Sequence, residues 1–180
     1  ADLGDAENIL SSPGAPPRVR KVDRKWGGRC RGRSRGGGGA RAAGLLGAGA
    51  DVNAAVADGI NPVACAAARG NDAAFEKLLR ADADVRARSQ SGDTLLMLAA
   101  RGNHATIVRR LVALRVGLDA QNAFGDTALI LASQAGASDV VDLLLEAGAK
   151  KALRNRDGVA AADAAAARGF DAVAARIRSS

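Results

Sequence analysis

The sequence predicts an all-α repeat solenoid, and three observations support this fold class. Four glycines, Gly59, Gly92, Gly125 and Gly158, follow one another at intervals of 33 residues without an insertion or deletion. Apolar pairs recur at a constant offset from these glycines: Leu45-Leu46, Leu78-Leu79, Leu111-Val112 and Leu144-Leu145. Aromatic residues make up only 2% of the chain. The core must therefore consist of small and aliphatic side chains, which favours thin, closely stacked helices.

The first helix of each unit should begin just after the periodic glycine. Asn61, Thr94 and Thr127 follow it and are good N-cap residues, because their side-chain oxygens can accept an amide hydrogen of the first turn. Pro62 fits the first helical position. The helices should end where a left-handed residue is available, at Gly70, at Gly102-Asn103, at Gly136 and at Gly169.

The second helix of each unit shows apolar residues three and four positions apart, which defines one buried face. These positions are Phe75-Leu78-Leu79, Ile107-Val108-Leu111-Val112 and Val140-Val141-Leu144-Leu145. One pair of short helices cannot bury both its faces, so neighbouring units must stack. Small pairs such as Ala66-Ala67 and Ala99-Ala100 allow the close approach that stacking requires.

From residue 44 to residue 180 the sequence resembles the ankyrin repeat family. The motifs are "GADVNA" at 49–54, "GDTLLMLAARGNH" at 92–104, "GDTALILASQAG" at 125–136 and "LLLEAGA" at 143–149. The resemblance implies helix-turn-helix units with projecting β-turn fingers. The family's Thr-Pro-Leu-His tetrapeptide appears here as 61–64, 94–97, 127–130 and 160–163 without its histidine, so the polar tie that this histidine makes between repeats should be missing.

The expected organisation has a basic segment followed by the repeat array. We expect a Gly/Arg-rich, disordered segment at 1–43, a partial first repeat at 44–57, repeats at 58–90, 91–123 and 124–156, and a C-terminal capping repeat at 157–180. In this last repeat the second-helix pair becomes Ile177-Arg178 and the first-helix leucine becomes Ala162. Such changes suit a terminal repeat whose outer face meets water.

The net charge of +7 belongs mostly to the first 43 residues, which hold 10 Lys/Arg against 4 Asp/Glu. The alternative function is therefore binding of nucleic acid or an acidic partner through residues 18–41, with an affinity that falls steeply with salt. Only Trp26 could stack on a base. A third interpretation is that residues 11–43 arise from a shifted reading frame and have no function.

The sequence predicts a protein that is not an enzyme and uses no cofactor or metal. It contains one histidine, no tyrosine and no recognisable nucleophile–base motif. Cys30 and Cys65 have no spacing that indicates a zinc site or a disulfide framework, and we expect Cys65 in the core of a first helix and His104 in a structural role. No apolar run is long enough to span a membrane. A cytoplasmic location and export after removal of a targeting segment both stay open.

The ankyrin resemblance implies binding of a protein partner by a monomer, through finger tips and the concave face of the first helices. On the fingers it assigns Asp58, Ile60, Gln90, Ser91, Asp93, Phe124, Asp126, Arg156, Asp157 and Val159. On the first helices it assigns Arg69, Arg101, Gln134 and Arg168. Phe124 is the leading candidate, unless its ring folds back onto a neighbouring finger. The three arginines form either a positive stripe or contacts with helix C-terminal carbonyls and solvent.

Overall fold

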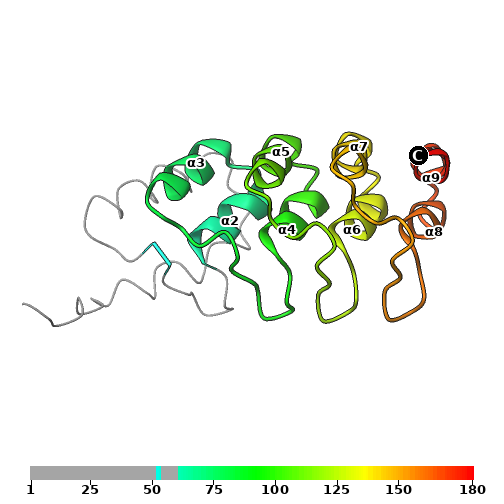
Figure 1. Ribbon diagram of the computed structural model, residues 1–180, viewed down its shortest axis with the longest axis horizontal. Coiled ribbons are helices and arrows are strands. Elements are labelled where there is room, and N and C mark those ends of the chain that lie inside the picture. The colour runs from blue at the N-terminus through cyan, green and yellow to red at the C-terminus, as the bar shows by residue number, and fades with distance from the viewer. Residues whose placement is uncertain (1–51, 54–60) are drawn as a thin grey trace, which may run out of the picture.

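The computed structural model describes residues 52–53 and 61–180, and within this part the chain forms eight helices in two parallel rows (Figure 1). The inner row contains α2 (Pro62–Arg69), α4 (Leu95–Arg101), α6 (Ala128–Ala135) and α8 (Ala161–Ala166). The outer row contains α3 (Asp72–Arg80), α5 (Ala105–Ala113), α7 (Ser138–Glu146) and α9 (Asp171–Ser179). The predicted all-α repeat solenoid is confirmed. The expected segment 1–43, and the partial repeat apart from residues 52–53, lie outside the described residues.

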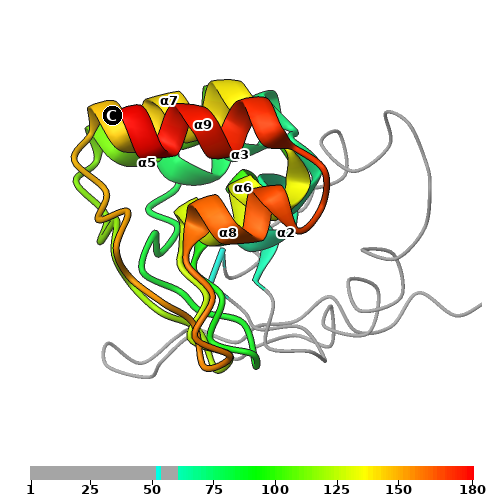
Figure 2. The same ribbon diagram turned by 90° about the vertical axis from the view of Figure 1, so that its right-hand side faces the viewer.

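Long loops connect each outer helix to the next inner helix and project to one side of the array as fingers (Figures 1 and 2). The view along the array in Figure 2 shows that the fingers superimpose, as expected of identical units stacked in register. The described residues contain no β-strand. Two fingers carry an isolated antiparallel bridge instead, Arg88 with Thr94 and Arg154 with Ala160.

Side-chain caps start three of the four inner helices, as the sequence predicts. Asn61 accepts a hydrogen bond from the Ala64 amide at 2.9 Å. Thr94 and Thr127 accept in the same way from the amides three residues further on, at 3.3 and 3.2 Å. Ala160 holds the corresponding position before α8 and has no side chain that can cap. The fourth inner helix therefore lacks a hydrogen bond that the others possess.

The inner helices end largely at the predicted residues. Gly70 and Gly136 adopt left-handed φ values of 66° and 67°, and Asn103 does the same in its unit with φ 56°. In the fourth unit the predicted left-handed residue is confirmed, with φ 80° at Gly169, but the helix is shorter than predicted, because α8 ends at Ala166. Its final turn tightens: the amides of Arg168 and Gly169 bond to carbonyls only three residues back.

The core fills the space between the two rows with aliphatic side chains. The outer helices contribute the predicted apolar positions, and Leu78, Leu111 and Leu144 are each at most 2% exposed. The second member of each apolar pair is only half-buried: Leu79, Val112 and Leu145. The inner row contributes an almost entirely buried set at Leu95, Leu96, Met97, Leu129 and Ile130.

Two aromatic rings lie at the starts of outer helices. Each packs on the glycine that ends the inner helix of the preceding repeat. A Cβ atom at Gly70 would collide with the His104 ring, and one at Gly136 would lie 2.5 Å from Cε1 of Phe170. His104 Nε2 also lies 3.3 Å from the carbonyl oxygen of Ala68. These contacts join successive repeats, which supports a structural role for His104.

Cys65 lies in α2 and is half-buried, so it is less enclosed than a core position. The structure describes it as disulfide-bonded, which makes the expectation that the cysteines form no disulfide wrong. The only other cysteine of the chain, Cys30, lies outside the described residues.

Candidate functional site

Each finger turns at the periodic glycine and is held by the residue three positions before it. Gly92, Gly125 and Gly158 have φ values between 74° and 78°, and their amides donate to the carbonyl oxygens of Ser89, Asn122 and Asn155 at 2.9 to 3.0 Å. This repeated turn fixes the path of the chain at each finger tip.

Asparagine side chains close two of the three fingers from inside. Oδ1 of Asn122 accepts hydrogen bonds from the amides of Phe124 and Asp126, both at 2.9 Å. Asn155 accepts from the equivalent amides of Asp157 and Val159, at 3.1 and 2.9 Å. An asparagine can satisfy two backbone donors in this way because its carbonyl oxygen has two lone pairs.

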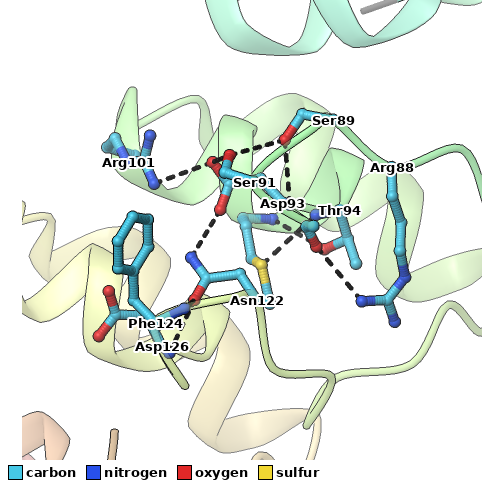
Figure 3. A network of polar contacts seen from close by, with 11 residues as sticks. Arg88, Ser89, Ser91, Asp93, Thr94, Arg101, Asn122, Phe124 and Asp126 are labelled. Carbon is cyan, nitrogen blue, oxygen red and sulfur yellow. Dashed lines mark hydrogen bonds and ion pairs between the residues drawn. The ribbon is translucent and has the colours of Figure 1, made fainter. Parts of the chain in front are cut away.

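The amide groups of the same asparagines reach across to the preceding finger. Nδ2 of Asn122 donates to Oδ1 of Asp93 at 2.6 Å, and Nδ2 of Asn155 donates to Oδ1 of Asp126 at 2.9 Å. Figure 3 shows the first of these ties, with Asp93 and Asn122 facing each other between two fingers. A charge-assisted bond of this kind is about twice as strong as a neutral one.

Backbone bonds complete the connection between fingers. The Ala123 amide donates to the Ser91 carbonyl at 2.9 Å, and one repeat later the Arg156 amide donates to the Phe124 carbonyl at 3.0 Å. The approach is close: a Cβ atom at Gly125 would lie only 2.8 Å from the Arg156 nitrogen. Hydrogen bonds therefore connect the fingers into one edge of the molecule.

A third set of side chains spans the gaps near the base of each finger. Arg88 Nη1 donates to the carbonyls of Gly92 and Gln121, both at 3.2 Å. Gln121 repeats the pattern with the carbonyls of Gly125 and Arg154, at 2.8 and 3.0 Å. Each of these side chains bonds its own finger and the next one.

Asp93, expected among the contact residues, is 4% exposed and fully engaged inside the protein. Its second oxygen, Oδ2, accepts from Arg101 Nη2 at 3.1 Å and from Ser91 Oγ at 3.2 Å. With Asn122 on Oδ1, the carboxylate has three donors, which offset the cost of burying its charge. Asp93 therefore organises the fingers from beneath their surface.

Phe124 is 60% exposed, the highest value among the large hydrophobic residues of the described chain. Its backbone is bonded on both sides, by Asn122 within its own finger and by Arg156 of the next. In Figure 3 the ring points toward Arg101. The structure thus places a solvent-facing aromatic ring on a fixed backbone.

The predicted arginines do not occupy one equivalent position. Arg69 and Arg101 are the last residues of α2 and α4, but they lie 32 residues apart, one short of the period. Arg168 lies beyond the end of α8. Arg69 is half-buried, and Arg101 and Arg168 are exposed.

The remaining predicted residues divide by exposure. Three are exposed: Gln90, Arg156 and Asp157. Four are half-buried: Ser91, Asp126, Gln134 and Val159. Asp58 and Ile60 lie outside the described residues. The structure thus brings residues of successive fingers together with Arg101 and Gln134 of the inner row.

The residues that connect the fingers were missed by the sequence reasoning. Ser89, Asn122 and Asn155 stand 33 residues apart, and so do Arg88, Gln121 and Arg154. That recurrence of polar, bonding side chains was the available signal. It was masked by variation in residue type, since Ser replaces Asn and Gln replaces Arg at equivalent positions.

Other kinds of site find little support in the described residues. This part of the chain brings together no group of three His, Cys, Asp or Glu side chains that could hold a metal ion. Two open cavities of about 500 and 420 Å³ lie at finger bases beside the outer helices, one lined by Leu145 and Lys151 and the other by Glu76 and Arg110. Neither includes a finger-tip residue. No described helix has the length and apolar character that a membrane crossing requires.

Comparison with known proteins agrees with this architecture. A family model described as ankyrin repeats (3 copies) matches residues 42–115 and, in an overlapping second match, residues 63–155. The two matches together extend over more than half of the chain. No curated protein matches the sequence.

Proposed function

The chain belongs to the ankyrin repeat family, whose repeats generally mediate protein–protein interaction, and from this premise we propose a non-catalytic binding scaffold. The partner is a protein that contacts the finger tips and the concave face of the inner helices. The observation that carries the proposal is the exposure of Phe124 on a finger fixed by its neighbours. An aromatic ring held in this way contributes a large contact area and loses little conformational freedom on binding.

Residues around Phe124 extend the proposed contact surface. Gln90 on the preceding finger and Arg156 and Asp157 on the following finger are exposed, and Arg101 flanks the ring from α4. Further proposed contacts are Gln134, Arg69, Arg168, Ser91, Asp126 and Val159. Asp93 is buried, so it supports this surface from within and is not exposed on it.

Site-specific photo-crosslinking tests the proposal. A photoreactive phenylalanine analogue replaces Phe124 in one version of the full chain and Leu114 in a second version. Leu114 is the matched control, because it is also an exposed large hydrophobic residue, 40% exposed, but follows the outer helix α5. Illumination in an extract of the native cells should give protein adducts at position 124 and few at position 114.

The same comparison with alanine provides an independent measurement. Phe124→Ala should lose the protein partners that the unaltered chain captures, whereas Leu114→Ala should retain them. Equal recovery by the two variants, together with equal crosslinking at both positions, would refute the finger-tip assignment.

A further inference from the structure

Arg101 and Phe124 are both hydrogen-bonded to a buried pair of residues, Asp93 and Asn122. Arg101 bonds Oδ2 of Asp93, Asn122 bonds Oδ1 of Asp93, and Asn122 Oδ1 holds the Phe124 amide. The three bonds measure 3.1, 2.6 and 2.9 Å. The guanidinium of Arg101 and the backbone of Phe124 are thereby connected through Asp93 and Asn122 (Figure 3).

Arg101 keeps hydrogen-bond donors available. Its side chain is 49% exposed, and among the described residues Nη2 is its only atom that bonds another side chain. A guanidinium carries five N–H donors in a fork that matches a carboxylate. Because Asp93 orients the group from below, Arg101 can bind a second acceptor from the solvent side without losing its first.

Among the exposed charged side chains near the ring, basic ones outnumber acidic ones. Asp93 is buried, and Asp126 is half-buried and accepts from Asn155, so neither carboxylate is freely presented. Arg156 is exposed on the next finger and forms no ion pair within the described residues. Asp157 is the one exposed acid on that finger tip.

We propose that Phe124 and Arg101 together bind an acidic segment of the partner protein. One large apolar side chain of the segment covers the Phe124 ring, and a neighbouring Asp or Glu carboxylate bonds Arg101. Arg156 adds attraction from the following finger. The inference rests on the proposed function and specifies the chemistry of the partner at that surface, where an apolar anchor supplies affinity and the charge pair supplies selectivity.

Nucleic acid is the alternative ligand for the surface around Phe124, and the observations favour a protein. From residue 44 onward the chain holds 16 Lys/Arg against 15 Asp/Glu, whereas binding of single strands needs a strongly positive groove and successive stacking rings. Phe124 is the one exposed aromatic residue on the described fingers. A single ring beside one arginine suits one apolar side chain with one carboxylate.

A random displayed peptide library, selected on the full chain, tests the proposal. Enriched peptides should contain Asp or Glu within two residues of a large apolar side chain. In synthetic copies, replacement of the acid by its amide should weaken binding to the unaltered protein about tenfold or more, the effect of losing a charge-assisted hydrogen bond. This arm does not depend on the folding of any variant.

Protein variants give the second arm. Phe124→Ala and Arg101→Gln should each weaken binding of the enriched peptides, and Arg109→Gln should not. Arg109 is the matched control, because it is exposed on α5 and forms no ion pair in the described part of the chain. Circular dichroism of every variant shows whether the helices are intact.

The possible failures are distinguishable. Peptides that need Phe124 but tolerate loss of the acid would overturn this inference and leave the proposed function standing. Peptides that ignore Phe124 would remove both. Failure to enrich any peptide, or displacement of enriched peptides by a single-stranded oligonucleotide at low salt, would also overturn the acidic-segment proposal.

Discussion

At the residue scale, Asp93 shows how one buried carboxylate organises an exposed surface. Its three donors come from its own finger, from the following finger and from an inner helix. A buried charge is tolerated only when it is bonded in this way, and the bonds in turn fix the groups that make them. The surface around Phe124 therefore depends on a residue that is itself buried.

Replacement of Asp93 by alanine should destabilise the fold. The Asn122 amide would lose its acceptor in a buried site, and we expect the free energy of unfolding to fall by about 2 kcal/mol. Urea denaturation followed by circular dichroism measures this difference. Asp157→Ala serves as control, because Asp157 is exposed, and its effect should stay within about 0.5 kcal/mol. Equal midpoints for the two variants would contradict the structural role of Asp93.

Glycine at 136 meets two requirements, a left-handed backbone and room for the Phe170 ring. Gly148 also follows a helix end with φ 89°, but nothing lies within 4 Å of the place that a Cβ atom would occupy there. Gly148→Ala should therefore lose only the backbone contribution, about 1 kcal/mol. Gly136→Ala should lose at least about 1 kcal/mol more, because the ring must move. Thermal unfolding compares the two, and an equal loss would show that the ring contact is unimportant.

At the scale of single elements, α8 is the weakest helix of the inner row. It has six residues, all of its apolar side chains are alanine, and its N-cap residue Ala160 makes no side-chain hydrogen bond. The three equivalent caps, Asn61, Thr94 and Thr127, all do. Since the backbone at Ala160 has φ −90° and ψ 168°, close to those three, the site is already shaped for a capping side chain.

Ala160→Thr should stabilise the protein by about 1 kcal/mol by adding this cap. Ala160→Val is the control, because valine has the same shape without the hydroxyl group. Denaturant titration of both variants separates the hydrogen bond from the added volume. A gain that is equal in the two variants would mean that packing, and not capping, limits α8.

At the scale of the whole molecule, stability should decline toward the C-terminal helices. Asp163 holds the position of Met97 and Ile130, which are completely buried, and it is exposed instead. It forms long ion pairs with Arg154 and Arg178, at 3.7 and 3.8 Å, which contribute little at an exposed site. In a stacked array each repeat depends on its neighbours, so among the described repeats the one whose inner helix buries only alanine should be the first to open.

Native-state hydrogen exchange tests this gradient. Amide hydrogens of α8 and α9 should exchange at least about tenfold faster than those of α5 and α7, because they open without unfolding the rest. Mass spectrometry of peptides from each helix measures the rates. Equal protection of α9 and α5 would indicate that the described array unfolds as one unit.

The sequence by itself determined the positions of the helices, because caps, left-handed turns and buried faces depend on residues close together in the chain. The period of 33 then determined how the units stack. The tertiary structure alone decided which finger residues face solvent. Asp93 and Phe124 both stand one residue from a periodic glycine, yet one is 4% and the other 60% exposed. Asp93 is buried by partners such as Asn122, which is 29 residues away and therefore gives no local signal.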